Sequence, residues 1–185
     1  MTSSENFKSL WQTALKFGII YTMAIIIIDL MFFIAGAYRG DHPVIDFIVS
    51  FISSVAIFFI GMKTRRDVDF NGYSKYGEVL KTALAIGVAA SVMVALWKLT
   101  YYSFINPEEL AKEYELIKKT ILENDIFDED KKMEILSQMK GANTATSKLS
   151  SYLIMTNVYA LIVGLILAIF LQKQHPDDAY NKLDV

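Results

Sequence analysis

Four polar residues interrupt the longest apolar stretches of this sequence, namely Asp29, Asp46, Lys98 and Asn157. An ionisable side chain inside a membrane helix is costly, so it usually faces a partner side chain, an ion or a polar ligand. At a rise of about 1.5 Å per residue, Asp29, Lys98 and Asn157 lie about 10–13 Å from the same end of their stretches. Asp46 lies close to that end. These residues therefore predict one polar cluster in the outer half of a membrane.

Three interpretations of this polar cluster stay open. In the first, Asp29, Lys98 and Asn157 line an outward-open cavity that binds a polar head group or an ion. In the second, Asp29 and Lys98 form an ion pair that only fixes the register of their helices. In the third, Lys98 extends its long stem to the outer membrane surface.

Other kinds of chemistry have little support in the sequence. The absence of cysteine excludes disulfides and thiol chemistry. The two histidines, His42 and His175, lie in separate polar segments, and no hydrolase, metalloprotease or phosphate-binding motif is present. The acidic segment 125–130 lacks the spacing, the glycine and the closing glutamate of an EF-hand. We therefore expect no catalytic residue, no metal and no cofactor.

The polar cluster needs helices that cross a membrane, and the sequence supplies four candidates. Of the 185 residues, 54% are apolar, the mean hydropathy is +0.34 and the net charge of −2 gives no reason to expect nucleic acid. A membrane helix needs about 20 mostly apolar residues. The candidate spans are residues 17–38, 44–62, 79–105 and 149–171. The alternation typical of barrel strands is missing, so we predict an all-α membrane protein, one domain over residues 1–185 built as a four-helix bundle.

Basic residues in the short segments predict the orientation of the bundle. One side carries nine of them, while the short loop on the other side carries Arg39 alone. The nine are Lys8, Lys16, Lys63, Arg65, Arg66, Lys75, Lys81, Lys173 and Lys182. Both termini, including the tail 172–185, are therefore predicted to be cytoplasmic, and residues 106–148 to be extracytoplasmic.

Two polar segments show helical patterns outside the four spans. Residues 7–16 have amphipathic spacing, which fits either an interfacial helix or a continuation of the first span. In the outer segment, Asn106, Pro107 and Glu109 form the start signals of a helix. A second short helix is expected from Asp128 to Gly141. The segment 106–148 is therefore predicted to be a short helical insert.

Small residues recur every four positions on the third and fourth spans, which lets membrane helices approach closely. They are Ala83, Gly87, Ser91, Ala95, Ala160, Gly164 and Ala168. Because the two spans run antiparallel, we expect Lys98 to face Asn157 and Gly87 to face Ala168.

Aromatic and basic residues gather around the loop between the second and third spans. They are Arg65, Arg66, Phe70, Tyr73, Lys75 and Tyr76. Such a group either anchors the loop to anionic lipid head groups or offers a docking surface to a cytoplasmic partner.

Three short motifs of the chain resemble a known family. Residues 14–18 read ALKFG, residues 69–78 read DFNGYSKYGE, and residues 101–108 read YYSFINPE. Together they resemble an uncharacterised four-span family of Bacteroidota, domain of unknown function 4199. The resemblance covers most of the chain and implies an outward helical insert and a bacterial inner membrane. It implies no activity, cofactor or catalytic residue, and it points to a polyprenyl-phosphate glycosyltransferase as a candidate partner.

Two function classes follow from these features. The leading hypothesis is a non-catalytic inner-membrane subunit or scaffold that acts through partner proteins, lipids or further copies of itself in the cell envelope. The alternative is a small transporter, channel or lipid-binding protein that uses the polar cluster.

Overall fold

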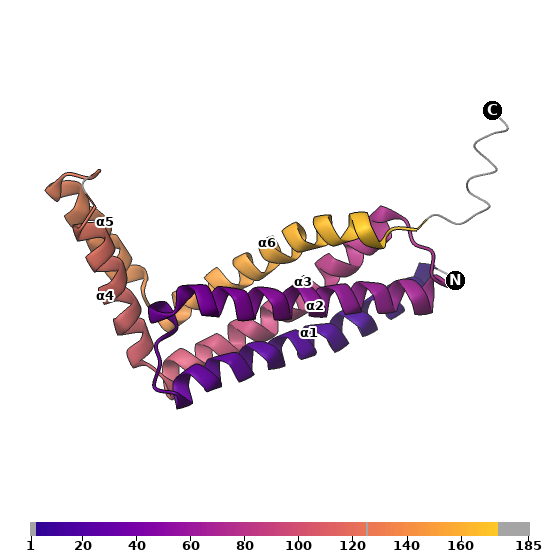
Figure 1. Cartoon of the computed structure of the whole chain (residues 1–185), viewed down its shortest axis with the longest axis horizontal. Coiled ribbons are helices and arrows are strands. Elements are labelled where there is room, and N and C mark those ends of the chain that lie inside the picture. The colour runs from indigo at the N-terminus through magenta and orange to yellow at the C-terminus, as the bar shows by residue number, and fades with distance from the viewer. Residues whose placement is uncertain (1–2, 125, 174–185) are drawn as a thin grey trace.

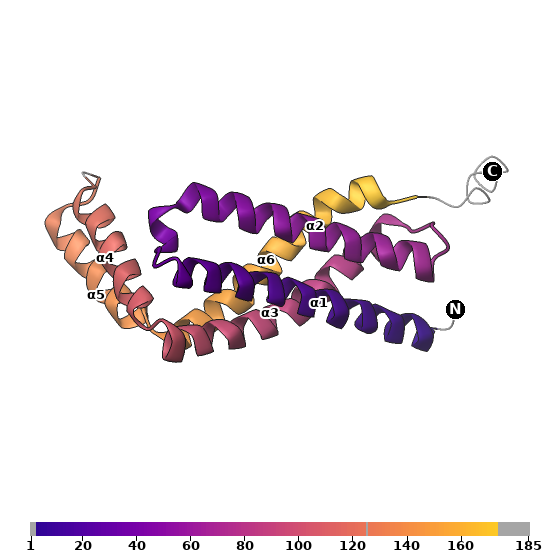
Figure 2. The same cartoon turned by 60° about the horizontal axis from the view of Figure 1, so that its bottom comes forward.

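The computed structural model describes residues 3–124 and 126–173. Its elements in chain order are α1 (Ser3–Ile34), the 3-10 turn η1 (Arg39–Asp41), α2 (Pro43–Asp69), α3 (Tyr76–Thr100), the π-helical turn η2 (Tyr101–Ile105), α4 (Glu108–Leu122), α5 (Glu129–Ala142) and α6 (Ala145–Leu171). The four long helices run side by side, and the short pair α4 and α5 lies at one end of them at a steep angle (Figures 1 and 2).

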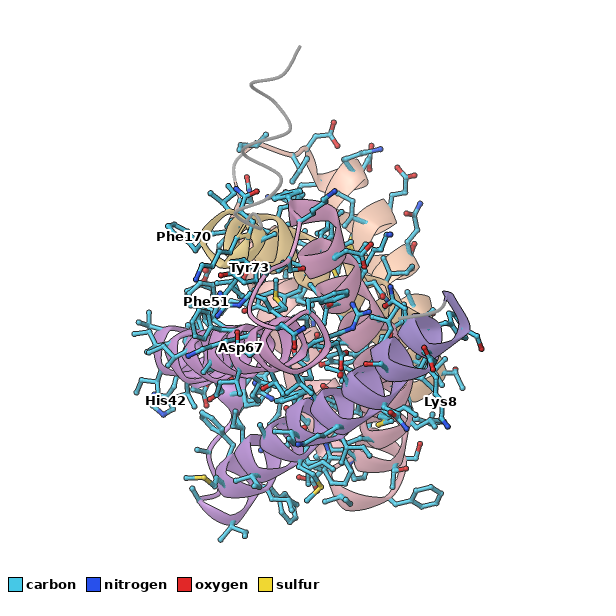
Figure 3. The ribbon with its side chains drawn as sticks, turned by 90° about the vertical axis from the view of Figure 1, so that its right-hand side faces the viewer. Lys8, His42, Phe51, Asp67, Tyr73 and Phe170 are labelled. Carbon is cyan, nitrogen blue, oxygen red and sulfur yellow. The ribbon has the colours of Figure 1, made fainter. Side chains whose placement is uncertain are left out.

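All four long helices are long and apolar enough to cross a membrane. Their outward faces carry large exposed apolar side chains, such as Phe51, which is 43% exposed, and Phe170, which is 75% exposed (Figure 3). A continuous apolar surface of this size is unfavourable in water and matches the hydrocarbon of a bilayer. The fold is therefore that of a multi-pass membrane protein.

The first helix differs from its predicted span at both ends. It begins at Ser3, so residues 7–16 continue the span and do not form a separate interfacial helix. It ends at Ile34, because Gly36 adopts a φ of +65° and residues 35–38 turn the chain toward η1. Glycine adopts this left-handed conformation without the steric cost that a side chain brings.

Helix α3 lies at the centre of the bundle and packs mainly against α1 and α6. In its most apolar window, 61% of the residues are buried, compared with 17% in α2. The predicted small residues make the contact with α6: a Cβ placed on Gly87 would overlap Ala160, and one on Gly164 would lie 2.7 Å from the Ala83 side chain. Close packing of small residues therefore holds the two helices together.

The register of this contact differs from the predicted one. Gly87 faces Ala160, two helical turns away from the predicted partner Ala168. A row of small residues at every fourth position fits its partner equally well after a shift of one or two turns. The row therefore predicted which faces meet but not which residues meet.

Between η2 and α6 the chain forms two short helices, α4 and α5, and these two helices begin in different ways. Asp128 caps α5, because its carboxylate accepts a 2.7 Å hydrogen bond from the Lys131 amide. Helix α4 begins at Glu108 without a side-chain cap, since the Asn106 side chain donates instead to the Glu109 carboxylate at 2.8 Å. The departure from the predicted capping pattern places Glu109 beside the polar cluster.

Candidate functional site

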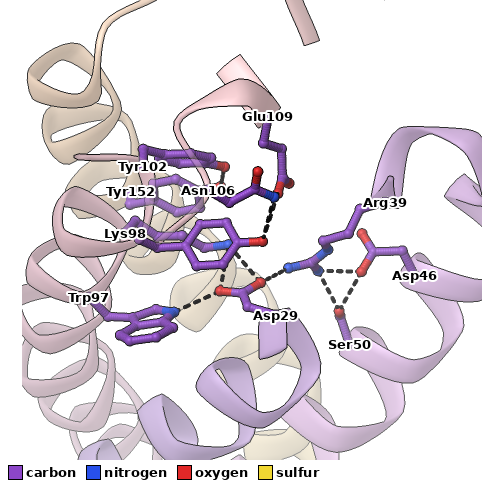
Figure 4. A network of polar contacts seen from close by, with 11 residues as sticks. Asp29, Arg39, Asp46, Ser50, Trp97, Lys98, Tyr102, Asn106, Glu109 and Tyr152 are labelled. Atoms are coloured by element: carbon purple, nitrogen blue, oxygen red, sulfur yellow. Dashed lines mark hydrogen bonds and ion pairs between the residues drawn. The ribbon is translucent and has the colours of Figure 1, made fainter. Parts of the chain in front are cut away.

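Asp29 is the centre of a charged network at the end of the bundle that carries the insert (Figure 4). Its side chain is fully buried. Lys98 Nζ lies 2.8 Å from the Asp29 carboxylate, and Trp97 Nε1 donates a 2.7 Å hydrogen bond to it. The guanidinium of Arg39 forms a second ion pair with the same carboxylate. Asp29 on α1 thus joins α3 to the turn η1.

Arg39 extends the network to α2. Its Nη2 pairs with the Asp46 carboxylate and lies 3.3 Å from Ser50 Oγ. Burial alone would lower the pKa of the Arg39 guanidinium, but the carboxylates of Asp29 and Asp46 outweigh it and raise that pKa. The guanidinium therefore stays charged, and the planar fork of its donors suits two carboxylates at once. We call Asp29, Arg39, Asp46 and Lys98 the charged network.

Tyrosine rings surround the ammonium group of Lys98. Its Nζ lies 5.2 Å from the ring centroid of Tyr152, 5.5 Å from that of Tyr101 and 5.7 Å from that of Tyr102. At these distances the rings attract the cation. Lys98 is 2% exposed, so the interpretation in which it extends to the outer surface is wrong.

The π-helical turn η2 brings further polar groups to this end. It carries Tyr101 and Tyr102, both buried, directly after the last turn of α3. The Tyr101 hydroxyl donates a 2.7 Å hydrogen bond to Glu109 Oε2, which also accepts from Asn106 at 2.8 Å. Short π-helical segments inside longer helices occur often at functional sites. Here the segment links the charged network to the first turn of α4.

The structure brings together three of the four residues predicted for the polar cluster. Asp29, Asp46 and Lys98 belong to the charged network. Asn157 does not, because its side chain donates a 2.7 Å hydrogen bond to the Leu153 carbonyl of its own helix. The register of α6 places Tyr152 beside Lys98 instead.

Sequence reasoning missed several members of the site. Arg39 was counted only as the single basic residue of its loop, although it lies ten residues after Asp29 and seven before Asp46. The aromatic residues Trp97, Tyr101 and Tyr102, close to Lys98 in the sequence, were a second signal of the site. Aromatic rings beside a buried cation attract it.

A cavity of about 640 Å³ lies between α1, α2, α3 and α6, with α4 at one end. The residues at that end are polar, and we call them the polar end of the cavity: Tyr38, Arg39, Asp46, Lys98, Glu109, Glu113 and Tyr152. The remaining wall is mostly apolar and includes Ile25, Phe47, Val94, Met155, Val158 and Ile162.

The cavity opens toward the lipid-facing surface between α2 and α6. Three of its lining residues there are largely exposed: Phe47 at 64%, Met155 at 65% and Ile162 at 53%. Other lining residues, such as Val94 at 3%, are buried deep inside the bundle. The cavity therefore reaches the apolar outer surface of the bundle at these residues.

At the opposite end of the bundle, the predicted docking group is partly internal. Arg65 is 1% exposed: its Nη1 donates a 2.8 Å hydrogen bond to Thr82, and its guanidinium lies 5.0 Å from the Phe70 ring. Contact of Arg65 with lipid or a partner is therefore excluded. Helix α2 continues to Asp69, seven residues beyond the predicted span, and this places Arg65 on its packed face.

Three other members of that group also make contacts within the chain. Arg66 donates to the Leu171 carbonyl at 3.3 Å, and the Tyr76 hydroxyl donates to the Leu165 carbonyl at 3.4 Å. Tyr73 lies under the ammonium group of Lys173 at 5.1 Å. Lys75 is exposed. Most of the predicted tail, residues 174–185, lies outside the described residues.

The comparisons with known proteins give a family without an activity. A family model described as "Protein of unknown function (DUF4199)" matches residues 16–173. The chain matches no curated protein and no solved structure. Among residues 3–124 and 126–173, no group of three or more histidine or acidic side chains could hold a metal ion.

Proposed function

The chain belongs to the DUF4199 family of proteins of unknown function, and we propose that it is an integral membrane protein that binds an amphipathic lipid in the cavity between α2 and α6. The head group of this lipid occupies the polar end of the cavity, and an acyl chain lies along the apolar wall. The protein binds the lipid without changing it chemically.

The observation that carries this proposal is that one cavity has a polar end and a mostly apolar wall. Ligand sites typically measure about 300–1,000 Å³ and are mostly apolar, with a few placed polar groups. In this cavity of about 640 Å³ the polar groups gather at one end, and the wall from Tyr152 to Ile162 is mostly apolar. Ten helical residues cover about 15 Å, so the wall accommodates a substantial part of one acyl chain.

The orientation of the bundle in the membrane forms part of the proposal. The start of α1, the α2–α3 connection and the end of α6 lie at one end of the bundle (Figure 1). Eight of the nine predicted inner basic residues belong to the described segments at that end, against Arg39 alone in the short α1–α2 connection at the other end. The insert at that other end carries seven further lysines, so the comparison is made between the short connections only. By the positive-inside rule, that end is cytoplasmic, and the cavity opens to the outer leaflet of a bacterial inner membrane.

Lipid retention by matched variants tests the proposal. Val158 lines the cavity, and Val158→Trp should fill it. Ile154 lies one turn away on the same helix, is 61% exposed and does not line the cavity, so Ile154→Trp is the control. Native mass spectrometry after purification in mild detergent should find bound lipid on the wild type and on Ile154→Trp, and little on Val158→Trp. Equal retention by both variants would contradict the proposal.

A second candidate function rests on the tip of the insert. Around the turn between α4 and α5, Leu122, Ile126, Phe127 and Met133 are exposed, with Ile126 at 84%. Apolar side chains gathered on a polar segment are typical of protein contact sites. This feature favours a subunit that acts through a partner protein. Cross-linking in native membranes from position 126 should then capture one partner, and capture of lipid alone would contradict it.

A further inference from the structure

We infer that the cavity selects a zwitterionic phospholipid whose head group carries a primary ammonium group, as in phosphatidylethanolamine. This inference rests on the proposed lipid-binding function and specifies its ligand. The ammonium group faces Glu109 and Glu113, and the phosphate faces the Lys98 and Arg39 side of the polar end.

The charges of the cavity are the first step of the argument. In the charged network, the two cations Lys98 and Arg39 are balanced by the carboxylates of Asp29 and Asp46. The network as a whole is therefore neutral, and it offers no net positive charge to a purely anionic head group. The neutral network still presents cationic donors to a phosphate that brings its own countercharge.

Glu109 and Glu113 add negative charge on α4 next to this network. Glu109 is 7% exposed, and its described hydrogen bonds come from two neutral donors, the Tyr101 hydroxyl and the Asn106 amide. Glu113 forms an ion pair with Lys148, in which Lys148 Nζ lies 2.5 Å from Glu113 Oε1. The polar end therefore carries one carboxylate in excess of its cations. A buried carboxylate whose described hydrogen bonds come from neutral donors favours a cationic ligand.

The surroundings of Tyr38 also indicate a negative electrostatic potential at the polar end of the cavity. Tyr38 lies in the loop before η1 and lines the polar end. Burial, followed by the carboxylates of Glu113 and Glu109, raises the pKa of its hydroxyl to about 12. The local potential thus opposes the appearance of another negative charge.

Tyr101 contacts both the cation Lys98 and the carboxylate of Glu109. Its ring centroid lies 5.5 Å from Lys98 Nζ, while its hydroxyl donates to Glu109 at 2.7 Å. A cationic and an anionic group are thus held on two sides of one tyrosine side chain. A phosphoethanolamine head group presents the matching pair of charges, joined by a two-carbon linker.

Related head groups fit less well for distinct reasons. The quaternary ammonium group of phosphatidylcholine carries no N–H, so it cannot donate to Glu109. Phosphatidylglycerol has no positive charge, so its phosphate would add to the excess of carboxylates. The expected order of affinity is phosphatidylethanolamine, then phosphatidylcholine, then phosphatidylglycerol.

Competition between these three lipids tests the inference. The full-length protein is reconstituted into nanodiscs with equal amounts of each, extracted gently and examined by native mass spectrometry. Phosphatidylethanolamine should be enriched about tenfold over phosphatidylglycerol, equivalent to about 1.4 kcal/mol, which a hydrogen bond to a charged group can supply. Glu109→Gln keeps an acceptor for Tyr101 and should lose most of this enrichment while it still binds lipid.

Two further variants make the result decisive. Glu113→Gln leaves the Lys148 charge unbalanced and should also reduce the enrichment, so the test does not depend on the folding of Glu109→Gln. Glu134→Gln on α5, half-exposed and away from the cavity, is the control and should bind like the wild type. Lipid bound without preference for the amine, or equal preference in all variants, overturns this inference alone. A wild type that retains no lipid overturns the proposed function as well.

Discussion

Lys98 Nζ lies 2.8 Å from the carboxylate of Asp29, and the two side chains are 3% and 0% exposed. The pair joins the centre of the bundle, α3, to the last turns of α1. Arg39 pairs with the same carboxylate from the other side. Asp29 therefore pairs with two cations at once. Its removal should affect more partners than the removal of Lys98.

Removal of Asp29 should harm the fold more than removal of Lys98. Asp29→Leu leaves the buried ammonium group of Lys98 without a counterion, which typically costs about 3–5 kcal/mol. Lys98→Met leaves Asp29 with Arg39 and Trp97, so the cost should be smaller. The double variant should be more stable than Asp29→Leu alone, because it strands no buried charge. Thermal unfolding in detergent measures all three; additive losses would contradict the ion-pair account. Lys81→Met, at a side chain 64% exposed, is the control.

Arg39 should not be replaceable by lysine. Its two Nη atoms pair with different carboxylates, Asp29 and Asp46, and a lysine ammonium group cannot reproduce this fork. We expect Arg39→Lys to lower the free energy of unfolding by about 1–3 kcal/mol. Arg66→Lys is the comparison: its guanidinium also contacts two acceptors, but these are the half-exposed Asp67 and the Leu171 carbonyl at 3.3 Å, with no second carboxylate, so it should lose less. Equal stability of both variants, measured by thermal unfolding, would show that the bridge contributes nothing.

Two glycines of α3 should respond oppositely to alanine. A Cβ on Gly87 would overlap Ala160, so Gly87→Ala should destabilise the bundle by about 1–3 kcal/mol. A Cβ on Gly77 would meet no atom within 4 Å, so Gly77→Ala should be neutral or stabilise by up to about 1 kcal/mol. Unfolding midpoints in detergent compare the two. A Gly87→Ala variant as stable as Gly77→Ala would place the α3–α6 contact elsewhere.

Tyr38 should ionise only in strongly alkaline solution. Burial and the carboxylates of Glu113 and Glu109 raise the pKa of its hydroxyl from 10.0 to about 12. Because the folded-state pKa is raised, the stabilising contribution is present below pH 10 and is lost as the pH rises toward about 12. The ultraviolet difference spectrum between the wild type and Tyr38→Phe gives the midpoint. In Glu113→Gln the midpoint should fall, and an unchanged midpoint would remove Glu113 as a cause.

The Asp29–Lys98 contact was predictable, but Asn157 was assigned to the wrong neighbours. Depth and a shared helix face suffice to bring together two residues of opposite charge, because a buried charge has few acceptable partners. An asparagine side chain can hydrogen-bond to a backbone carbonyl of its own helix, as Asn157 does with Leu153. Its depth in the membrane therefore does not predict which other helix it contacts. Small-residue rows likewise left the α3–α6 register undetermined.

Hydropathy also did not reveal how far α2 continues beyond its apolar stretch. Arg65 lies past the apolar stretch of α2, and a charge there normally contacts water or lipid head groups. The helix continues, however, and Arg65 binds Thr82 inside the bundle. Arg39 was overlooked for a similar reason: its loop position suggested solvent, whereas the turn η1 folds back onto Asp29 and Asp46.

Lipid photolabelling tests most directly whether a lipid chain occupies the interior of the bundle. Val94 and Thr156 line the cavity but are only 3% and 6% exposed, so lipids around the protein cannot reach them. A phospholipid with a photoreactive group on its acyl chain should label these two residues in the wild type, and Val158→Trp should abolish this labelling. Labelling confined to outward residues such as Ile154 and Ile169 would contradict the account.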